Sequence, residues 1–134
     1  MKKLMGILVA VLFTAITASA VTVVKSTSKV TGFGVDAQVV SWSGLTSVDD
    51  GSSAKVAGYS NKSVQVTGTF TASSMLIQGS NNGVSWTTLK NSQGNALTFS
   101  AAGLERIQEP TLYIRPLTSG TASATIKVEL FIQK

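Results

Sequence analysis

The sequence predicts an all-β protein: an antiparallel β-sandwich of the immunoglobulin-like or jelly-roll class, preceded by an apolar leader helix. From residue 21 onward the chain is rich in Thr, Ser, Val, Gly and Asn, residues that favour strands and turns. This part contains about eight short segments that alternate apolar and polar residues, separated by turn signals at roughly eight- to twelve-residue intervals. No helical periodicity continues beyond the leader.

The most regular alternation lies at the C-terminus. In residues 122–132, Ile126, Val128, Leu130 and Ile132 occupy every second position, so we expect them to face the core. Residues 63–70 alternate in the same way and place Val64, Val66 and Phe70 on one face. We expect residues 74–80 to form the partner strand of this segment after a turn at residues 71–73.

Turn residues define the other strands. Asn81, Asn82 and Gly83 tolerate positive φ, which predicts a hairpin over residues 75–89. Pro116 cannot donate to a ladder, so we expect the strand over residues 111–117 to end there, at a sheet edge or a bulge. Further short strands are predicted over residues 35–42, 53–57, 96–100 and 101–107.

The first twenty residues resemble a targeting segment. Lys2 and Lys3 precede an apolar stretch over residues 4–16, and residues 18–20 (ASA) match a signal-peptidase site, which predicts a signal peptide cleaved after Ala20. Two alternatives remain: a hydrophobic anchor that extends through residue 24, or a leader buried in an assembly. The predicted organisation is therefore residues 1–20 as signal peptide or hydrophobic anchor, 21–34 as an extended N-terminal arm, and 35–134 as the β-sandwich domain.

The composition argues against an enzyme. The 134 residues include no Cys and no His, which excludes thiol nucleophiles, imidazole acid–base chemistry and the usual zinc ligands. Of the six carboxylates, Glu105 and Glu109 lie on a predicted strand and loop that need not converge. Asp49 and Asp50 lack the spacing of a calcium loop, so we expect a solvated turn there. We predict no catalytic residue, no cofactor and no metal site.

The net charge of +5 does not indicate a nucleic-acid-binding face. The 11 Lys and Arg residues are dispersed along the chain, without a basic cluster beyond the pair at its start. We therefore expect no specific nucleic acid as a partner, and a membrane only if residues 1–24 are retained as an anchor.

Two groups of residues are candidates for binding. In the arm, Val21, Val23, Lys25 and Lys29 are candidate partner contacts, because an extended segment can add a strand to a neighbouring molecule. The aromatic residues form the second group and have two interpretations. They either pack in the core or form a platform for a sugar ring, and the platform would consist of Trp42, Trp86 and Tyr113. Arg115, within an apolar strand, is expected to pair with a carboxylate or a neighbouring subunit.

Four blocks of sequence carry a family resemblance. In order they are YSNKSVQVTGTF (59–70), IQGSNNGVSWTTL (77–89), QGNAL (93–97) and YIRP (113–116). Their order resembles that of small structural proteins from the virions of tailed bacteriophages, and the resemblance covers roughly residues 35–132. It implies a β-sandwich that decorates or cements a capsid, often as a symmetric homo-oligomer.

Two functions therefore stand as expectations. The resemblance implies a non-enzymatic virion protein whose partners are the major capsid protein or other virion proteins. The leader favours the alternative, a bacterial β-sandwich module, secreted, periplasmic or at the cell surface, that binds a glycan or another surface ligand through the aromatic platform.

Overall fold

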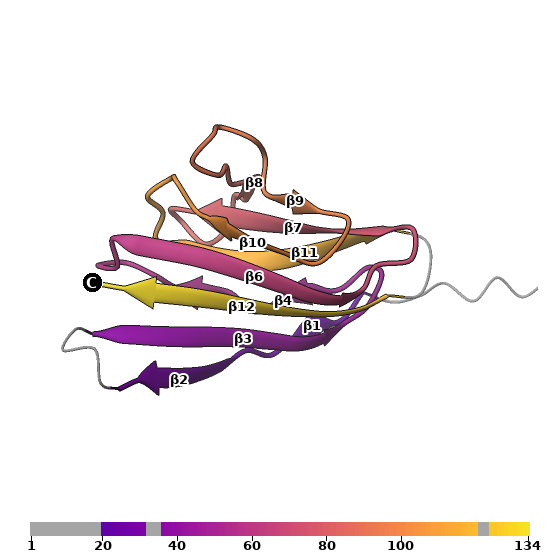
Figure 1. The fold of residues 1–134 in the computed structure, drawn as a ribbon, viewed down its shortest axis with the longest axis horizontal. Coiled ribbons are helices and arrows are strands. Elements are labelled where there is room, and N and C mark those ends of the chain that lie inside the picture. Colours follow the sequence, from indigo (N-terminus) through magenta and orange to yellow (C-terminus); the bar gives the residue numbers. More distant parts are fainter. Residues whose placement is uncertain (1–19, 32–35, 121–123) are drawn as a thin grey trace, which may run out of the picture.

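The computed structural model describes residues 20–31, 36–120 and 124–134. They form two β-sheets packed face to face, as Figure 1 shows, which confirms the predicted sandwich. The predicted leader, except for Ala20, lies outside the described residues. Within the described ranges, no helix has the length and apolar character that a membrane crossing requires.

One sheet is antiparallel throughout, and in the described part of the chain it contains five strands. β12 lies at its centre between β3 and β6, and β2 and β10 form the two edges (Figure 1). In sheet order the strands are β10 (Gly103–Arg106), β6 (Asn61–Thr69), β12 (Thr125–Gln133), β3 (Ala37–Leu45) and β2 (Ser26–Val30).

The other sheet combines two long strands with several short ones. β11 (Tyr113–Gly120) pairs with β7 (Ser73–Ser80) along its whole length. β7 also pairs with β8 and β9, while β11 pairs with β4 and β5, and β1 runs parallel to β4. These short strands are β1 (Thr22–Val23), β4 (Asp50–Gly51), β5 (Ala54–Lys55), β8 (Thr87–Thr88) and β9 (Thr98–Phe99).

The core lies between the two sheets and follows the alternation of the sequence. β12 buries Ile126, Val128, Leu130 and Ile132, as predicted. β3 buries Val40 and Trp42, and β6 buries Val64 and Val66, on the same side of the sheet. The second sheet contributes the facing layer of the core. The largest fully buried side chains are Trp42, Leu45, Met75, Ile77, Leu97, Ile114, Ile126, Leu130, Ile132, Val56, Val64 and Val66.

The predicted hairpin over residues 75–89 is confirmed. Gln78 of β7 pairs with Thr88 of β8, and Gly83 in the connecting turn has a φ of 74°. The predicted pairing of residues 63–70 with residues 74–80 is wrong, because β6 and β7 belong to different sheets. Both edges of β6 are already occupied, by β10 and β12, so the chain crosses to the other sheet after Thr69.

The prediction that the strand ends at Pro116 is also wrong. β11 continues through Pro116 to Gly120 and lies in the interior of its sheet. On one side Pro116 is opposite Ile77 of β7. On the other side it falls between the positions that pair with β5 and with β4, so the proline sits where the neighbouring strand is interrupted.

Trp42 of β3 joins the two layers. Its side chain is 0% exposed, and its Nε1 donates a 2.8 Å hydrogen bond to the carbonyl oxygen of Ser52, between β4 and β5 of the other sheet. Gly51 provides the space for this packing. A Cβ at Gly51 would lie 2.5 Å from Cγ of Pro116 and 2.7 Å from Cδ1 of Trp42.

Substitution of Gly51 tests this inter-sheet packing. We expect Gly51→Ala to lower the free energy of unfolding by about 1–3 kcal/mol, because the added methyl group overpacks a site closed by the rings of Pro116 and Trp42. Ser53→Ala, at an exposed position two residues away, is the control and should change stability by less than about 0.5 kcal/mol. Urea denaturation of both variants measures the difference, and equal stability would contradict the packing described here.

Candidate contact surfaces

The N-terminal segment is built into both sheets of its own chain. β1 pairs with β4 in one sheet, and β2 then pairs with β3 in the other. Val23 packs against the core, whereas the side chain of Val21 is exposed. In the described part of the chain, β2 has a partner on one side only, so its outer edge is available for strand addition.

The two arm lysines differ in their surroundings. Lys25 is half-buried: its amide donates to Oγ of Ser52 at 3.0 Å, and its Nζ donates to the carbonyl oxygen of Ser53 at 2.8 Å. Lys29 is exposed on β2, opposite Gln38 of β3. Of these two, Lys29 is the one placed to contact another molecule.

Asp49 anchors the start of this segment, and the expectation of a solvated turn there is wrong. The residue is only 4% exposed. Its Oδ2 accepts hydrogen bonds from the amide and hydroxyl of Thr46 at 2.7 and 2.6 Å, and its Oδ1 accepts from the amide of Val21 at 3.2 Å. Burial raises the pKa of Asp49, but the hydrogen bonds from Thr46 and Val21 outweigh it and hold the pKa below its usual value.

The three predicted platform aromatics do not lie together on a surface. Trp42 is buried in the core, as described above. Trp86 and Tyr113 are half-buried, and Arg115 lies over the Trp86 ring with its Cζ 4.4 Å from the ring centroid. The available aromatic surface in this part of the molecule is therefore restricted to Trp86 and Tyr113.

Arg115 is the centre of a polar network on β11, and its predicted pairing with a carboxylate is confirmed. Nη1 lies 3.2 Å from Oδ2 of Asp50, and Nε donates to Oε1 of Gln78 at 3.0 Å. The other carboxylate oxygen of Asp50 accepts a 2.8 Å hydrogen bond from the hydroxyl of Thr22. The network thus joins four strands of this sheet, β11, β7, β4 and β1, and the guanidinium is bound to partners within the chain.

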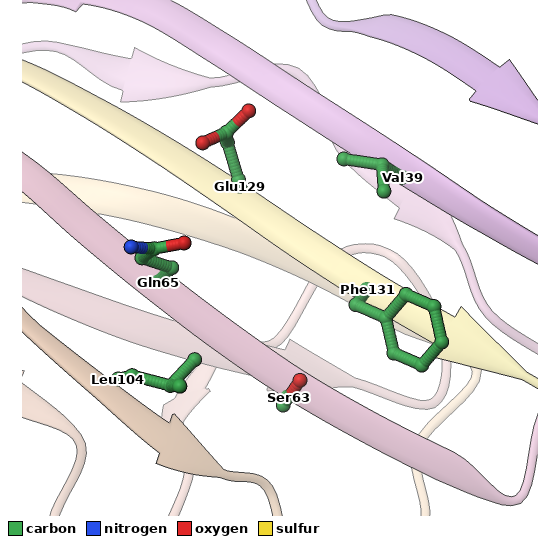
Figure 2. A pocket seen from close by; sticks show the side chains of 6 residues that line it. All are labelled: Val39, Ser63, Gln65, Leu104, Glu129 and Phe131. Atoms are coloured by element: carbon green, nitrogen blue, oxygen red, sulfur yellow. The ribbon is translucent and has the colours of Figure 1, made fainter. Parts of the chain in front are cut away.

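The outer face of the five-stranded sheet has a shallow depression, lined by both apolar and polar side chains, that sequence reasoning missed. It has a volume of about 190 Å³, and Figure 2 shows its side chains on one face of four neighbouring strands. They are Val39, Ser63, Gln65, Leu104, Glu129 and Phe131. Leu104 is 67% exposed. One signal in the sequence could have revealed this depression: Phe131 is apolar and points outward, although its neighbours Leu130 and Ile132 are apolar and point into the core.

A salt bridge and one further cation, Arg106, lie around this depression. Lys127 and Glu129, two residues apart on β12, form a salt bridge of 2.9 Å. In the described residues, no group of three or more acidic side chains is arranged to hold a metal ion. The face therefore offers shape and apolar contact area, with one ion pair beside the depression and the cation Arg106 at its border.

The comparisons with known proteins give one structural relative. No protein-family model matches the chain, and no curated protein matches it. The fold is similar to that of the SPBc2 prophage-derived protein YomS, known from a crystal structure, with a TM-score of 0.54 and 12% sequence identity. The match covers 73% of this chain and 95% of that protein. At this identity the similarity shows a shared β-rich fold.

Replacement of Asp49 tests its role as an anchor. We expect Asp49→Asn to lower the free energy of unfolding at pH 7 by about 1.5–3 kcal/mol, because it removes charge-assisted hydrogen bonds from a buried site. The folded-state pKa of Asp49 lies below the unfolded value of about 3.9. Its stabilising contribution is therefore complete above that value and is lost as the pH falls through the folded-state pKa.

The measurement is urea denaturation as a function of pH from neutral to acidic solution. Asp49→Asn should show a smaller loss of stability on acidification than the unmodified chain. Asp36→Asn is the comparison variant, because the Asp36 carboxylate is exposed and paired with Lys134 at 2.8 Å. If Asp49→Asn kept the stability and the pH dependence of the unmodified chain, the anchoring role would be contradicted.

Proposed function

We propose that this protein is a non-enzymatic structural protein of a phage virion, which decorates or cements the capsid through one face and one edge of its five-stranded sheet. The observation that carries the proposal is the outer face of that sheet. It presents Leu104, Val39 and Phe131 around a shallow depression, next to a balanced ion pair. Such a surface is suited to lie against a flat protein shell.

Two further observations support this proposal. The fold is similar to that of a prophage-derived protein, which agrees in class with the family that the four sequence blocks resemble. The edge strand β2 adjoins the same face and can extend its sheet into a neighbouring molecule. A symmetric shell presents many identical binding sites. When linked copies bind neighbouring sites, their affinities combine, so each copy requires only a modest interface. The partners under this proposal are the major capsid protein or other virion proteins, with a homo-oligomer as the natural arrangement.

The alternative, a glycan-binding module of the cell surface, has less support from the side chains. A sugar platform needs exposed aromatic rings, and Trp42 is enclosed by the core. Trp86 has Arg115 over its ring, and the guanidinium is already bound to Asp50 and Gln78. The remaining aromatic surface is smaller than the platform that the sequence suggested.

A matched pair of substitutions tests the proposed function. Leu104→Asp places a charge on the proposed contact face, and Val84→Asp places the same charge at another exposed apolar residue, in the turn before β8. The particles to be used come from a phage lysate that contains the protein, and each purified variant is added back to particles depleted of it. Bound protein is measured by sedimentation through a density gradient.

We expect Leu104→Asp to weaken particle binding roughly tenfold to hundredfold, since an exposed leucine that becomes buried contributes about 1.5–3 kcal/mol. Val84→Asp should bind like the unmodified chain. Equal binding of both variants would reject this face as the contact. Recovery of the protein in the medium or the periplasm, with none on particles, would reject the virion function and favour the secreted module.

A further inference from the structure

Lys62 occupies a position that belongs to the core. It is two residues before Val64 on β6 and shares the inward-facing side of that strand, opposite Ile132 of β12. The residue is 6% exposed. A lysine is rarely this buried unless an opposite charge compensates it, because an ammonium group loses its hydration there.

The chain supplies little compensation for this charge. Nζ of Lys62 donates one hydrogen bond, of 3.3 Å, to the carbonyl oxygen of Tyr59. An ammonium group has three donors, so two are left for other acceptors. Among the ion pairs of the described residues, none includes Lys62. Burial accordingly lowers the pKa of Lys62.

A cavity that is open to solvent lies beside this lysine. Lys62 is opposite Ile132 of β12, at the end of the sandwich where the C-terminus lies (Figure 1). Its volume is about 490 Å³, within the range of about 300–1,000 Å³ that is typical of small-molecule sites. The walls include Val56, Tyr59, Asn81, Thr111 and Leu112, and Lys62 is the charged residue of the lining. The Oδ1 atom of Asn81 accepts from the amide of Leu112 at 3.2 Å, so its side-chain NH₂ group can donate to a ligand.

The surroundings are positively charged as well. Arg106 borders a second, smaller depression that also includes Lys62, and its guanidinium donates to Oδ1 of Asn61 at 3.4 Å. Nζ of Lys134 lies 5.9 Å from the centroid of the Tyr59 ring and forms a salt bridge with Asp36. Asp36 compensates the charge of Lys134, so Lys62 and Arg106 are the two cations at this end that none of the ion pairs of the described residues includes, and they attract an anionic group.

We propose that this cavity binds a carboxylate group, with Lys62 as its cationic anchor and the side-chain amide of Asn81 as a second donor. One ammonium group matches a monoanion, and the apolar walls accept the short carbon chain that carries it. The carboxylate belongs either to an acidic side chain of a partner protein or to a small organic acid, and the site stands independently of the proposed virion function.

The test is a titration of the full chain, labelled with ¹³C at the lysine side chains and followed by NMR. The probes are butyrate, its uncharged analogue butyramide, and the blocked peptide acetyl-Ala-Glu-Ala-amide with its Gln counterpart. We expect a carboxylate probe to shift the Lys62 Cε signal saturably and to raise the Lys62 pKa, while butyramide and the Gln peptide leave both unchanged. Binding by the variants is followed at the backbone amide signals of the residues that line the cavity, in ¹⁵N-labelled protein, because Lys62→Met has no Lys62 signal. Lys62→Met should weaken carboxylate binding at least tenfold, and Lys55→Met, at an exposed lysine of β5, should leave it unchanged.

The two sources of the carboxylate are distinguished by the probes. Saturation by butyrate indicates a small organic acid, whereas saturation by the Glu peptide alone indicates an acidic side chain of a partner. The proposal is overturned if neither carboxylate saturates the Lys62 signal, if butyramide binds as well as butyrate, or if Lys62→Met binds like the unmodified chain. Lys62→Gln repeats the test with a polar side chain, and thermal melting confirms that each variant is folded.

Discussion

The insertion of Trp42 between the two sheets is the contact on which the other surfaces depend. A fully buried indole on β3 fills the core, and its Nε1 hydrogen bond reaches the chain between β4 and β5 of the opposite sheet. Gly51 of β4 leaves space for the ring, and β4 also pairs with β1 from the N-terminal segment. The relative placement of the sheets, and therefore the shape of both outer faces, follows from this packing.

The two outer faces differ in what they leave available. On the seven-stranded sheet, Arg115 is bound to Asp50 and Gln78 and covers Trp86, so its polar groups are used within the chain. On the five-stranded sheet, Leu104 and Phe131 border an open depression (Figure 2). A contact that buries apolar area and displaces few internal bonds is more favourable on the second face. This asymmetry is the physical basis for assigning the contact face.

The N-terminal strands are hydrogen-bonded into both sheets of the sandwich. Residues expected to form a separate arm are hydrogen-bonded to β4 in one sheet and to β3 in the other, and Asp49 holds the amide of Val21. Removal of the segment would therefore disturb both sheets as well as any partner contact. Single substitutions on exposed side chains separate binding from folding more cleanly.

Local patterns predicted much of the fold, and contacts between distant segments account for what they missed. Alternation identified the strand that buries Ile126 to Ile132, and Asn81 to Gly83 identified a hairpin, because both signals lie within a few residues. The pairing of β6 depended on β10 and β12, which lie far away in sequence. The burial of Asp49 depends on Val21, 28 residues away, and that of Lys62 on packing between the sheets. The sequence left two interpretations of Trp42, a core residue or part of a sugar platform. The packing of the two sheets around its side chain decides for the core.

The most direct measurement is a cryo-electron microscopy reconstruction of phage particles that carry the protein, at a resolution that separates the two sheets. We expect the sandwich on the outside of the shell, with the face of β10, β6, β12 and β3 toward the capsid and Leu104 within the contact. A sandwich that faces the capsid with Trp86 and Arg115, or particles that carry no such density, would contradict the proposed role.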